Sequence, residues 1–220
     1  MKEENKDIIP SRTPAERALD VTSFITSAVP WIGGPVSNVL GGISFGRKLN
    51  RVREVLTGFA EDLKGFRSEL SEEYVKTEEF EELLERTLRL SAEERHEEKR
   101  RIYRLFLTET VKNPGKSYDE QIRFLCTLED LQADDLLILR AISQPPSQDP
   151  EMLGSPMQTL RRRLPQMNEQ HIRELVNHLN DNRITTLTNL GTIMTGRGAE
   201  DLVHLITPYG HRFVQFIKEA

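Results

Sequence analysis

The chain has 220 residues with 30 lysines and arginines against 35 aspartates and glutamates, so its net charge is −5 at neutral pH. A chain with this net charge has no overall positive field that would attract nucleic acid or anionic lipid. The length allows one large or two small domains. The single cysteine, Cys126, excludes a disulfide within the chain and favours a reducing compartment. We therefore expect a cytoplasmic protein, peripheral to the inner membrane if it binds lipid.

Residues 21–46 form an uncharged segment, VTSFITSAVPWIGGPVSNVLGGISFG, in a chain that is 30% charged. A segment of this kind must be buried by its own protein, by a partner or by a lipid bilayer. Basic residues follow it directly, and such a cluster suits an anionic lipid surface. The residues that we assign to this membrane or partner segment are Trp31, Gly33, Gly34, Gly41, Gly42, Gly46, Arg47 and Lys48.

Helices are expected on both sides of the Gly/Pro-rich turn inside the uncharged segment. After a polar, flexible lead-in at residues 1–13, a first helix should run over residues 14–29 and end at Pro30. A second helix should cover residues 35–70. A bilayer-spanning helix needs about 20 mostly apolar residues, and neither arm of the segment reaches that length. We expect a buried helical hairpin within a bundle, with triggered membrane insertion and burial against a partner as alternatives.

The stretch from Glu72 to Lys112 is strongly helical, because its apolar residues recur at three- and four-residue intervals. Residues 93–101 (EERHEEKRR) contain no apolar side chain, and this mixed run of charges indicates a solvated face. Residues 113–116 (NPGK) then break the helix. The next expected elements are a helix capped by Ser117 and ending at Cys126, a helix over Asp134–Ile142, and a proline-rich loop over Ser143–Pro156.

The C-terminal third changes character, with short helices and runs rich in threonine and β-branched residues. We expect helices at 157–164, 169–180 (capped by Asn168) and 208–218, and a β-hairpin of residues 184–194 and 202–206 with a turn at 196–198. Helix, turn, helix, hairpin and helix is the order of a winged helix. The string HLITPYGHRF at residues 204–213 resembles the ITxxGxxF ending of bacterial winged helices, in which the last strand of the wing leads into the closing helix.

The whole layout resembles an uncharacterised bacterial family of helical proteins. These proteins share a Gly/Pro-rich apolar N-terminal segment, a helix with a charged EEKRR run, and a winged-helix-like C-terminal domain. The resemblance implies architecture and no activity. The predicted fold is mainly α, with an N-terminal helical bundle over residues 14–126 followed by a small α+β winged-helix-like domain over residues 128–220.

No pattern in the sequence indicates catalysis, a metal site or a cofactor. We therefore expect a non-enzymatic binding or effector protein whose winged helix is an interaction module. Its expected ligand is a protein partner or a second copy of the chain, and its apolar hairpin is either core or membrane-insertable.

A winged-helix DNA-binding transcriptional regulator is the alternative. Residues 151–220 hold 8 basic and 7 acidic residues, whereas DNA-binding domains usually show a marked basic excess, so charge disfavours this alternative. The candidate nucleic-acid contacts, from the expected recognition helix, the helix before it and the turn, are Arg161, Arg162, Arg163, Gln170, Arg173, Asn177 and Arg197.

Overall fold

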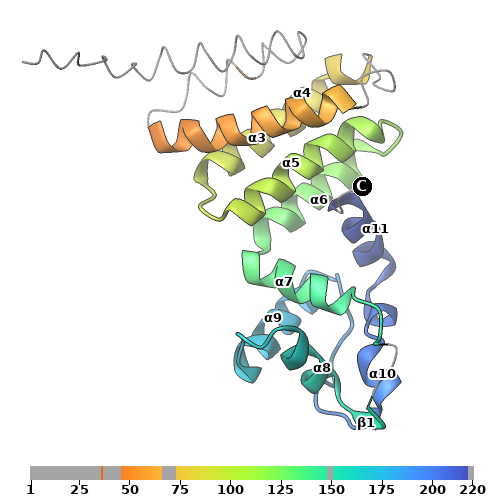
Figure 1. The fold of residues 1–220 in the computed structure, drawn as a ribbon. Helices are drawn as coiled ribbons and strands as arrows, with labels where there is room; N and C mark the ends of the chain where they lie inside the picture. The colour runs from red at the N-terminus through yellow and green to blue at the C-terminus, as the bar shows by residue number, and fades with distance from the viewer. Residues whose placement is uncertain (1–35, 37–45, 66–72, 148–150, 218–220) are drawn as a thin grey trace, which may run out of the picture. The chain divides into compact units, whose positions relative to one another are not determined.

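The computed structural model describes residues 36, 46–65, 73–147 and 151–217. Within these residues the chain forms nine α-helices and one two-stranded antiparallel sheet (Figure 1), which confirms the expectation of a mainly helical protein. The chain divides into two compact units, one ending at Arg95 and the other beginning at His96.

The described part of the N-terminal unit contains two helices that pack against each other, α3 (Gly46–Gly65) and α4 (Glu78–Glu93), with a short 3-10 helix η3 (Tyr74–Lys76) between them along the chain. The apolar residues at three- and four-residue spacing are buried in both helices, as predicted for this part: Leu49, Val52, Leu56, Phe59 and Leu63 in α3, and Phe80, Leu83, Leu84 and Leu88 in α4. Burying each side chain of this size contributes about 1.5–3 kcal/mol. The predicted first helix, at residues 14–29, lies outside the described residues.

The charged run at residues 93–101 differs from its prediction in two ways. The helical stretch is interrupted at residues 94–96, where Glu94 and His96 adopt extended backbone with ψ of 125° and 122°. The predicted solvated face is also wrong for Lys99 and Arg100, which are buried. The Lys99 ammonium donates a hydrogen bond to the Glu129 carbonyl at 3.0 Å, so the buried charge has a polar partner.

The C-terminal unit begins with α5 (Glu97–Lys112), α6 (Tyr118–Asp130) and α7 (Ala133–Ile142), and it ends with α11 (Pro208–Ile217). The Ser117 hydroxyl accepts a hydrogen bond from the Glu120 amide at 3.3 Å, as the predicted cap requires. The ring of Phe216 in α11 lies 5.4 Å from that of Phe106 in α5 and 5.1 Å from that of Phe124 in α6, centroid to centroid. These contacts place α5 and α6 in the same compact unit as the C-terminal helix, whereas the sequence suggested a division near residue 127.

Two further helices follow, α8 (Pro156–Arg163) and α9 (Glu169–Asp181). Each begins at a capping side chain: the Ser155 hydroxyl accepts from the Gln158 amide at 3.3 Å, and Asn168 Oδ1 accepts from the His171 amide at 2.9 Å. Both helices and the Asn168 cap agree with the prediction to within one residue at each end.

The predicted β-hairpin of residues 184–194 and 202–206 is wrong in its pairing. Strand β2 (Met194–Thr195) pairs instead with β1 (Leu153–Gly154), in the loop before α8. The expected turn at residues 196–198 is part of a helix, α10 (Gly196–Glu200), and a 3-10 helix η4 (Val203–Leu205) follows it. Between the two predicted strands the described residues contain one antiparallel bridge, Thr185 to Ile206.

The side chain of Asn180 explains why a longer hairpin does not form. Its Oδ1 accepts hydrogen bonds from the Leu187 amide at 3.1 Å and the Thr185 hydroxyl at 2.7 Å, and its Nδ2 donates to the Leu187 carbonyl at 2.9 Å. The amide and carbonyl of Leu187 therefore have their partners in a side chain and need no neighbouring strand.

The ITxxGxxF residues have structural roles at the start of α11. The Thr207 hydroxyl accepts from the Gly210 amide at 2.9 Å and donates to the Arg183 carbonyl at 2.6 Å. Gly210 lies so close to the preceding chain that an added Cβ would stand 2.1 Å from the Ile184 carbonyl oxygen. Phe213 is fully buried, and its ring lies 5.9 Å from that of Phe124.

We predict that Gly210→Ala lowers the free energy of unfolding by roughly 2 kcal/mol, because the added methyl group overpacks the contact with Ile184. Gly115→Ala is the matched control, since a Cβ added at Gly115 would meet no atom within 4 Å, and it should leave stability unchanged or slightly raised. Urea unfolding of the two variants measures the difference, and equal stabilities would contradict the close approach.

Candidate functional site

A basic hollow lies where α3 begins and α4 ends. It has a volume of about 690 Å³ and is lined by Gly46, Arg47, Lys48, Arg51, Glu93 and Arg95. Four of these six residues are basic and one is acidic, so the lining carries an excess of positive charge. The hollow directly follows the uncharged segment along the chain, because Gly46 is the last residue of that segment and the first of α3.

Two of the basic residues are held by the end of α4. Arg51 Nη1 donates to the carbonyls of Ala92 at 3.0 Å and Glu93 at 3.2 Å. These carbonyls lie in the last turn of α4, where no intrahelical amide reaches them, so the guanidinium caps the helix and complements its dipole. Lys48 forms an ion pair with the Glu93 carboxylate.

The remaining two basic side chains, Arg47 and Arg95, belong to exposed residues. Sequence reasoning identified Gly46, Arg47 and Lys48 but missed Arg95, because only the break after α4 brings the residue to this hollow. Of the other residues assigned to the membrane or partner segment, Trp31, Gly33, Gly34, Gly41 and Gly42 lie outside the described residues. Within the uncharged segment the described residues are Val36, which is helical and buried, and Gly46.

The three consecutive arginines predicted to meet nucleic acid are engaged within the chain. Arg163 Nη1 donates to the Ala141 carbonyl at 2.7 Å, and Nη2 donates to the carbonyls of Pro145 at 3.2 Å and Glu200 at 3.1 Å. Arg161 pairs with Glu169 across 3.0 Å. A DNA phosphate would have to compete with these groups for both guanidinium ions.

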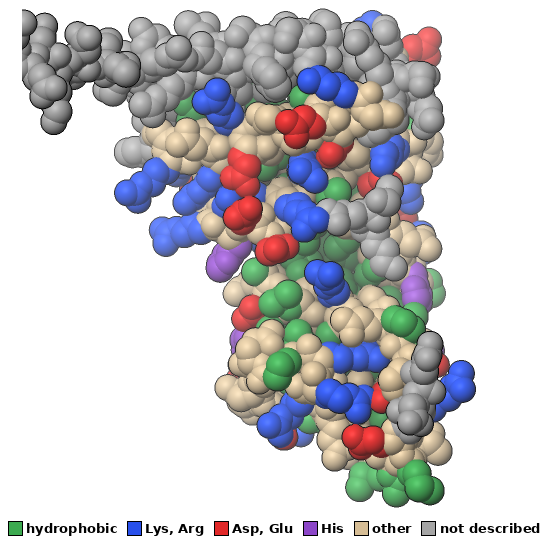
Figure 2. All heavy atoms as spheres, viewed as in Figure 1, with side chains coloured by type: hydrophobic (Ala, Val, Ile, Leu, Met, Phe, Trp, Pro, Cys, Tyr) green, Lys and Arg blue, Asp and Glu red, His purple; other side chains and the backbone are tan. Residues whose placement is uncertain are grey.

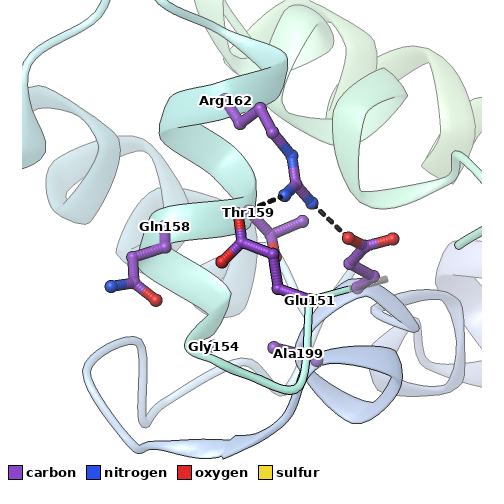
Figure 3. A pocket seen from close by; sticks show the side chains of 8 residues that line it. Glu151, Gly154, Gln158, Thr159, Arg162 and Ala199 are labelled. Carbon is purple, nitrogen blue, oxygen red and sulfur yellow. Dashed lines mark hydrogen bonds and ion pairs between the residues drawn. The ribbon is translucent and has the colours of Figure 1, made fainter. Parts of the chain in front are cut away.

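Arg162 belongs to a small polar pocket of about 220 Å³ (Figure 3). Its Nη1 lies 3.5 Å from Glu151 Oε1, and its Nη2 is bonded to Glu200 Oε1. Glu200 is only 3% exposed, and its Oε2 accepts a hydrogen bond from the Ser147 amide at 2.6 Å. Hydrogen bonding from Ser147 is the main cause that lowers the pKa of the Glu200 carboxyl, and Arg162 adds to it against the opposing effect of burial. The carboxylate thus links three parts of its own unit and is best explained as a structural group.

The other candidate nucleic-acid contacts lie on α9 and α10. Gln170, Arg173 and Asn177 are exposed at helical spacing on α9, where Gln170 Nε2 donates to Glu174 Oε1 at 2.9 Å. Arg197 is exposed on α10 and not in the turn of a hairpin. The structure places an acidic residue among the α9 side chains that would face a groove, and the role of these residues in DNA binding stays a prediction.

Two histidines of α9 pair with aspartates of α7: His171 Nε2 lies 2.9 Å from Asp134 Oδ2, and His178 Nδ1 lies 2.9 Å from Asp135 Oδ2. In the part of the chain that the structure describes, no group of three or more His, Cys, Asp or Glu side chains has the arrangement of a metal site. The same residues include no helix that is long and apolar enough to span a bilayer.

Comparisons of the chain with protein-family models, with curated proteins and with solved structures find no match. The inference of its function therefore rests on the contacts and charges of the chain itself.

We predict that Arg163→Ala lowers the free energy of unfolding by roughly 2–3 kcal/mol, because three carbonyls lose a charged donor. The exposed pair of Arg161 with Glu169 contributes little, so Arg161→Ala should cost at most about 0.5 kcal/mol. Chemical unfolding of both variants tests this difference. Equal, small effects would mean that Arg163 is not a structural group and would restore it as a candidate ligand contact.

The lowered pKa of Glu200 predicts a pH dependence of stability. A carboxyl whose pKa is lower in the folded chain than in the unfolded chain stabilises the fold above the unfolded value, about 4.3. This contribution is lost as the pH falls through the folded pKa. Glu200→Gln should therefore lower the free energy of unfolding by roughly 1–2 kcal/mol at pH 7. This difference from the original chain, the stability gap, should narrow below about pH 4. Urea unfolding at pH 7 and at about pH 3.5 measures the gap, and a constant gap contradicts the prediction.

Proposed function

We propose that the protein is a non-enzymatic binding protein that meets an anionic lipid surface through the basic hollow of its N-terminal unit. The observation that carries the proposal is the gathering of Arg47, Lys48, Arg51 and Arg95 around one hollow at the end of the uncharged segment. Each basic residue near an anionic surface contributes about 1 kcal/mol of attraction. In this proposal the protein is cytoplasmic and peripheral to the inner membrane.

The uncharged segment supports the same function. A membrane-inserting segment must avoid charge because a charged side chain is costly in hydrocarbon, and residues 21–46 contain none. Trp31 lies near the middle of the segment, and tryptophan is favoured at membrane interfaces. We propose that the segment is kept buried until a trigger releases it to the lipid that the basic hollow has bound.

The C-terminal unit supplies the protein contacts in this proposal, as a winged-helix-like module. Support comes from the order of α7, β1, α8 and α9, and from the antiparallel bridge that joins the chain after α9 to the residues before α11. The missing hairpin leaves this module without a long wing, and a short wing offers little to a DNA backbone.

DNA binding remains the second candidate because Arg173, Asn177 and Arg197 are exposed. Against it stand the internal bonds of Arg161, Arg162 and Arg163 and the acidic residues beside them. On the face drawn in Figure 2, acidic side chains lie among the basic ones of this unit. A protein contact is therefore the function that we assign to this unit.

The test is flotation of the full chain with vesicles of phosphatidylcholine containing about 30% phosphatidylglycerol, whose negative surface potential attracts basic clusters. We predict that the double variant Arg47→Ala, Arg95→Ala partitions about 30-fold less, since two contributions of about 1 kcal/mol are lost. Arg51 is left intact because it caps α4.

The double variant Arg173→Ala, Arg197→Ala is the matched control, because it removes the same charge from exposed residues of the other unit. It should bind vesicles like the original chain. Equal binding by the two double variants would contradict the lipid role of the basic hollow. Salt-sensitive DNA binding that only the control variant loses would favour the regulator instead.

A further inference from the structure

The C-terminal unit exposes an apolar tip beside its small sheet, formed by Met152, Leu153 and Ile193. Their exposed fractions are 93%, 64% and 75%, and Figure 2 shows hydrophobic side chains gathered at the end where Figure 1 labels β1. The described residues include a fourth large hydrophobic side chain that is exposed, Leu137 at 37%. Isolated exposed aliphatic residues are ordinary, but a group of three at one end of a unit indicates an interaction surface.

The strands hold the apolar tip in a fixed geometry. Leu153 lies opposite Thr195 in the antiparallel pair, and the Gly196 amide donates to the Met152 carbonyl at 3.1 Å. Ile193 precedes Thr195 by two residues, so strand alternation places it on the same face as Leu153, at the distance of a diagonal cross-strand neighbour, while Met152 projects from the other face of the same end. Side chains that project from a two-stranded ribbon cannot enclose a small molecule. They can be buried only by a concave surface or by lipid.

Leu137 belongs to such a concave surface in the same unit. An apolar groove of about 390 Å³ runs between α5, α7 and α11, and eight of its twelve lining residues are apolar. The principal ones are Ile102, Leu105, Leu136, Leu137, Val214 and Ile217. The charged residues of the lining are Glu98, Arg101 and Arg140, so the groove has a net positive charge.

The tip and the groove are complementary in shape and in charge. The tip is convex and aliphatic, and the groove is concave and aliphatic. Glu151, whose side chain is 74% exposed, directly precedes Met152, while the groove carries two arginines against one glutamate. Together these two surfaces account for all four exposed large hydrophobic side chains of the described residues.

We propose that the chain associates with a second copy of itself head to tail, with the apolar tip of one copy docked into the apolar groove of the next. Glu151 then lies toward the arginines of the groove. This inference rests on the protein-contact role proposed for the C-terminal unit and names its partner. It does not require lipid binding by the basic hollow.

A contact between two different surfaces of the same chain is heterologous, so each pair of copies keeps one free tip and one free groove. Association then continues into rings or open chains and does not stop at a symmetric dimer. Three side chains cover much less area than a standard interface, so the association is weak and depends on concentration.

Sedimentation equilibrium of the full chain tests the proposal. The weight-average mass should rise from that of the 25.3 kDa monomer as the concentration increases from about 10 to 500 µM, the range expected for interfaces of less than standard size. Ile193→Asp removes the tip and Leu137→Asp removes the groove, and each variant alone should associate at least about tenfold more weakly. Thr192→Asp and Gln144→Asp, at exposed neighbouring positions, are the controls of equal charge and should associate normally.

The decisive measurement mixes the two variants in equal amounts. Ile193→Asp keeps an intact groove and Leu137→Asp keeps an intact tip, so the mixture should form dimers of one copy of each and nothing larger. A contact between two tips would instead let Leu137→Asp associate with itself, because its tip is intact, and this outcome would overturn the proposal. A chain that stays monomeric at every concentration would also overturn it. So would an Ile193→Asp variant that no longer floats with vesicles but self-associates like the original chain.

Both positions are exposed, so the substitutions should leave the thermal unfolding midpoint unchanged, as circular dichroism can verify. If either variant is unfolded, Leu153→Asp for the tip and Arg140→Glu for the groove replace it in the same mixture. The double variant Arg47→Ala, Arg95→Ala should associate like the original chain. Failure of lipid binding and failure of self-association are thereby distinguished.

Discussion

The Glu200 carboxylate is the group that joins α8, α10 and the loop after α7 in the C-terminal unit. Its two oxygens accept from the Ser147 amide, in the loop after α7, and from Arg162 of α8. The carbonyl of the same residue accepts from Arg163, which also bonds the carbonyl of Ala141 at the end of α7. One buried acid on a five-residue helix thus fixes the loop, α8 and α10 together. A buried charge of this kind is tolerated because it is paired and hydrogen-bonded.

The same network determines which arginines of the unit are occupied by contacts within the fold. Because Arg162 and Arg163 point to Glu200 and to backbone carbonyls, the cluster that resembles a phosphate-binding run in the sequence is engaged within the fold. The network also fixes Gly196, where β2 continues into α10 and where an added Cβ would stand 1.6 Å from the Glu151 carbonyl oxygen. The absence of a side chain at Gly196 lets β1 lie against β2, where the Gly196 amide donates to the Met152 carbonyl, and the two strands carry the apolar tip.

Local signals in the sequence were sufficient for most helices and for their beginnings. Ser117 and Asn168 cap the helices that were expected to start there. A short polar side chain before an apolar periodic run can accept a hydrogen bond from an amide of the first helical turn. The stripe of α3 from Leu49 to Leu63 is buried for the same kind of reason, as a three- and four-residue repeat places all its members on one face.

What the sequence could not supply were pairings between distant residues. The expected hairpin failed because Asn180 satisfies the backbone of Leu187, and because residues 153–154, hidden in a proline-rich loop, pair with β2. The burial of Lys99 depends on the carbonyl of Glu129, 30 residues away, which no local pattern reveals. Arg95 joins the basic hollow only because the helix stops at Glu93, where Arg51 supplies the capping bonds.

The two units differ in the kind of surface that their described residues expose. In the N-terminal unit the distinctive feature is charge, since the basic hollow has four cations and one carboxylate after 26 residues without any charge. In the C-terminal unit Arg161, Arg162 and Arg163 are bonded within the chain, and the distinctive feature is exposed aliphatic surface. Charge attracts a polyanionic surface over a Debye length of about 10 Å, whereas aliphatic side chains act only in contact. In our proposal, attraction to a membrane is therefore assigned to the N-terminal unit, and selection of a partner by shape is assigned to the C-terminal unit. If the N-terminal unit binds the chain to a lipid surface, the local concentration of the chain rises there. A weak contact between C-terminal units is then populated, because its occupancy depends on concentration.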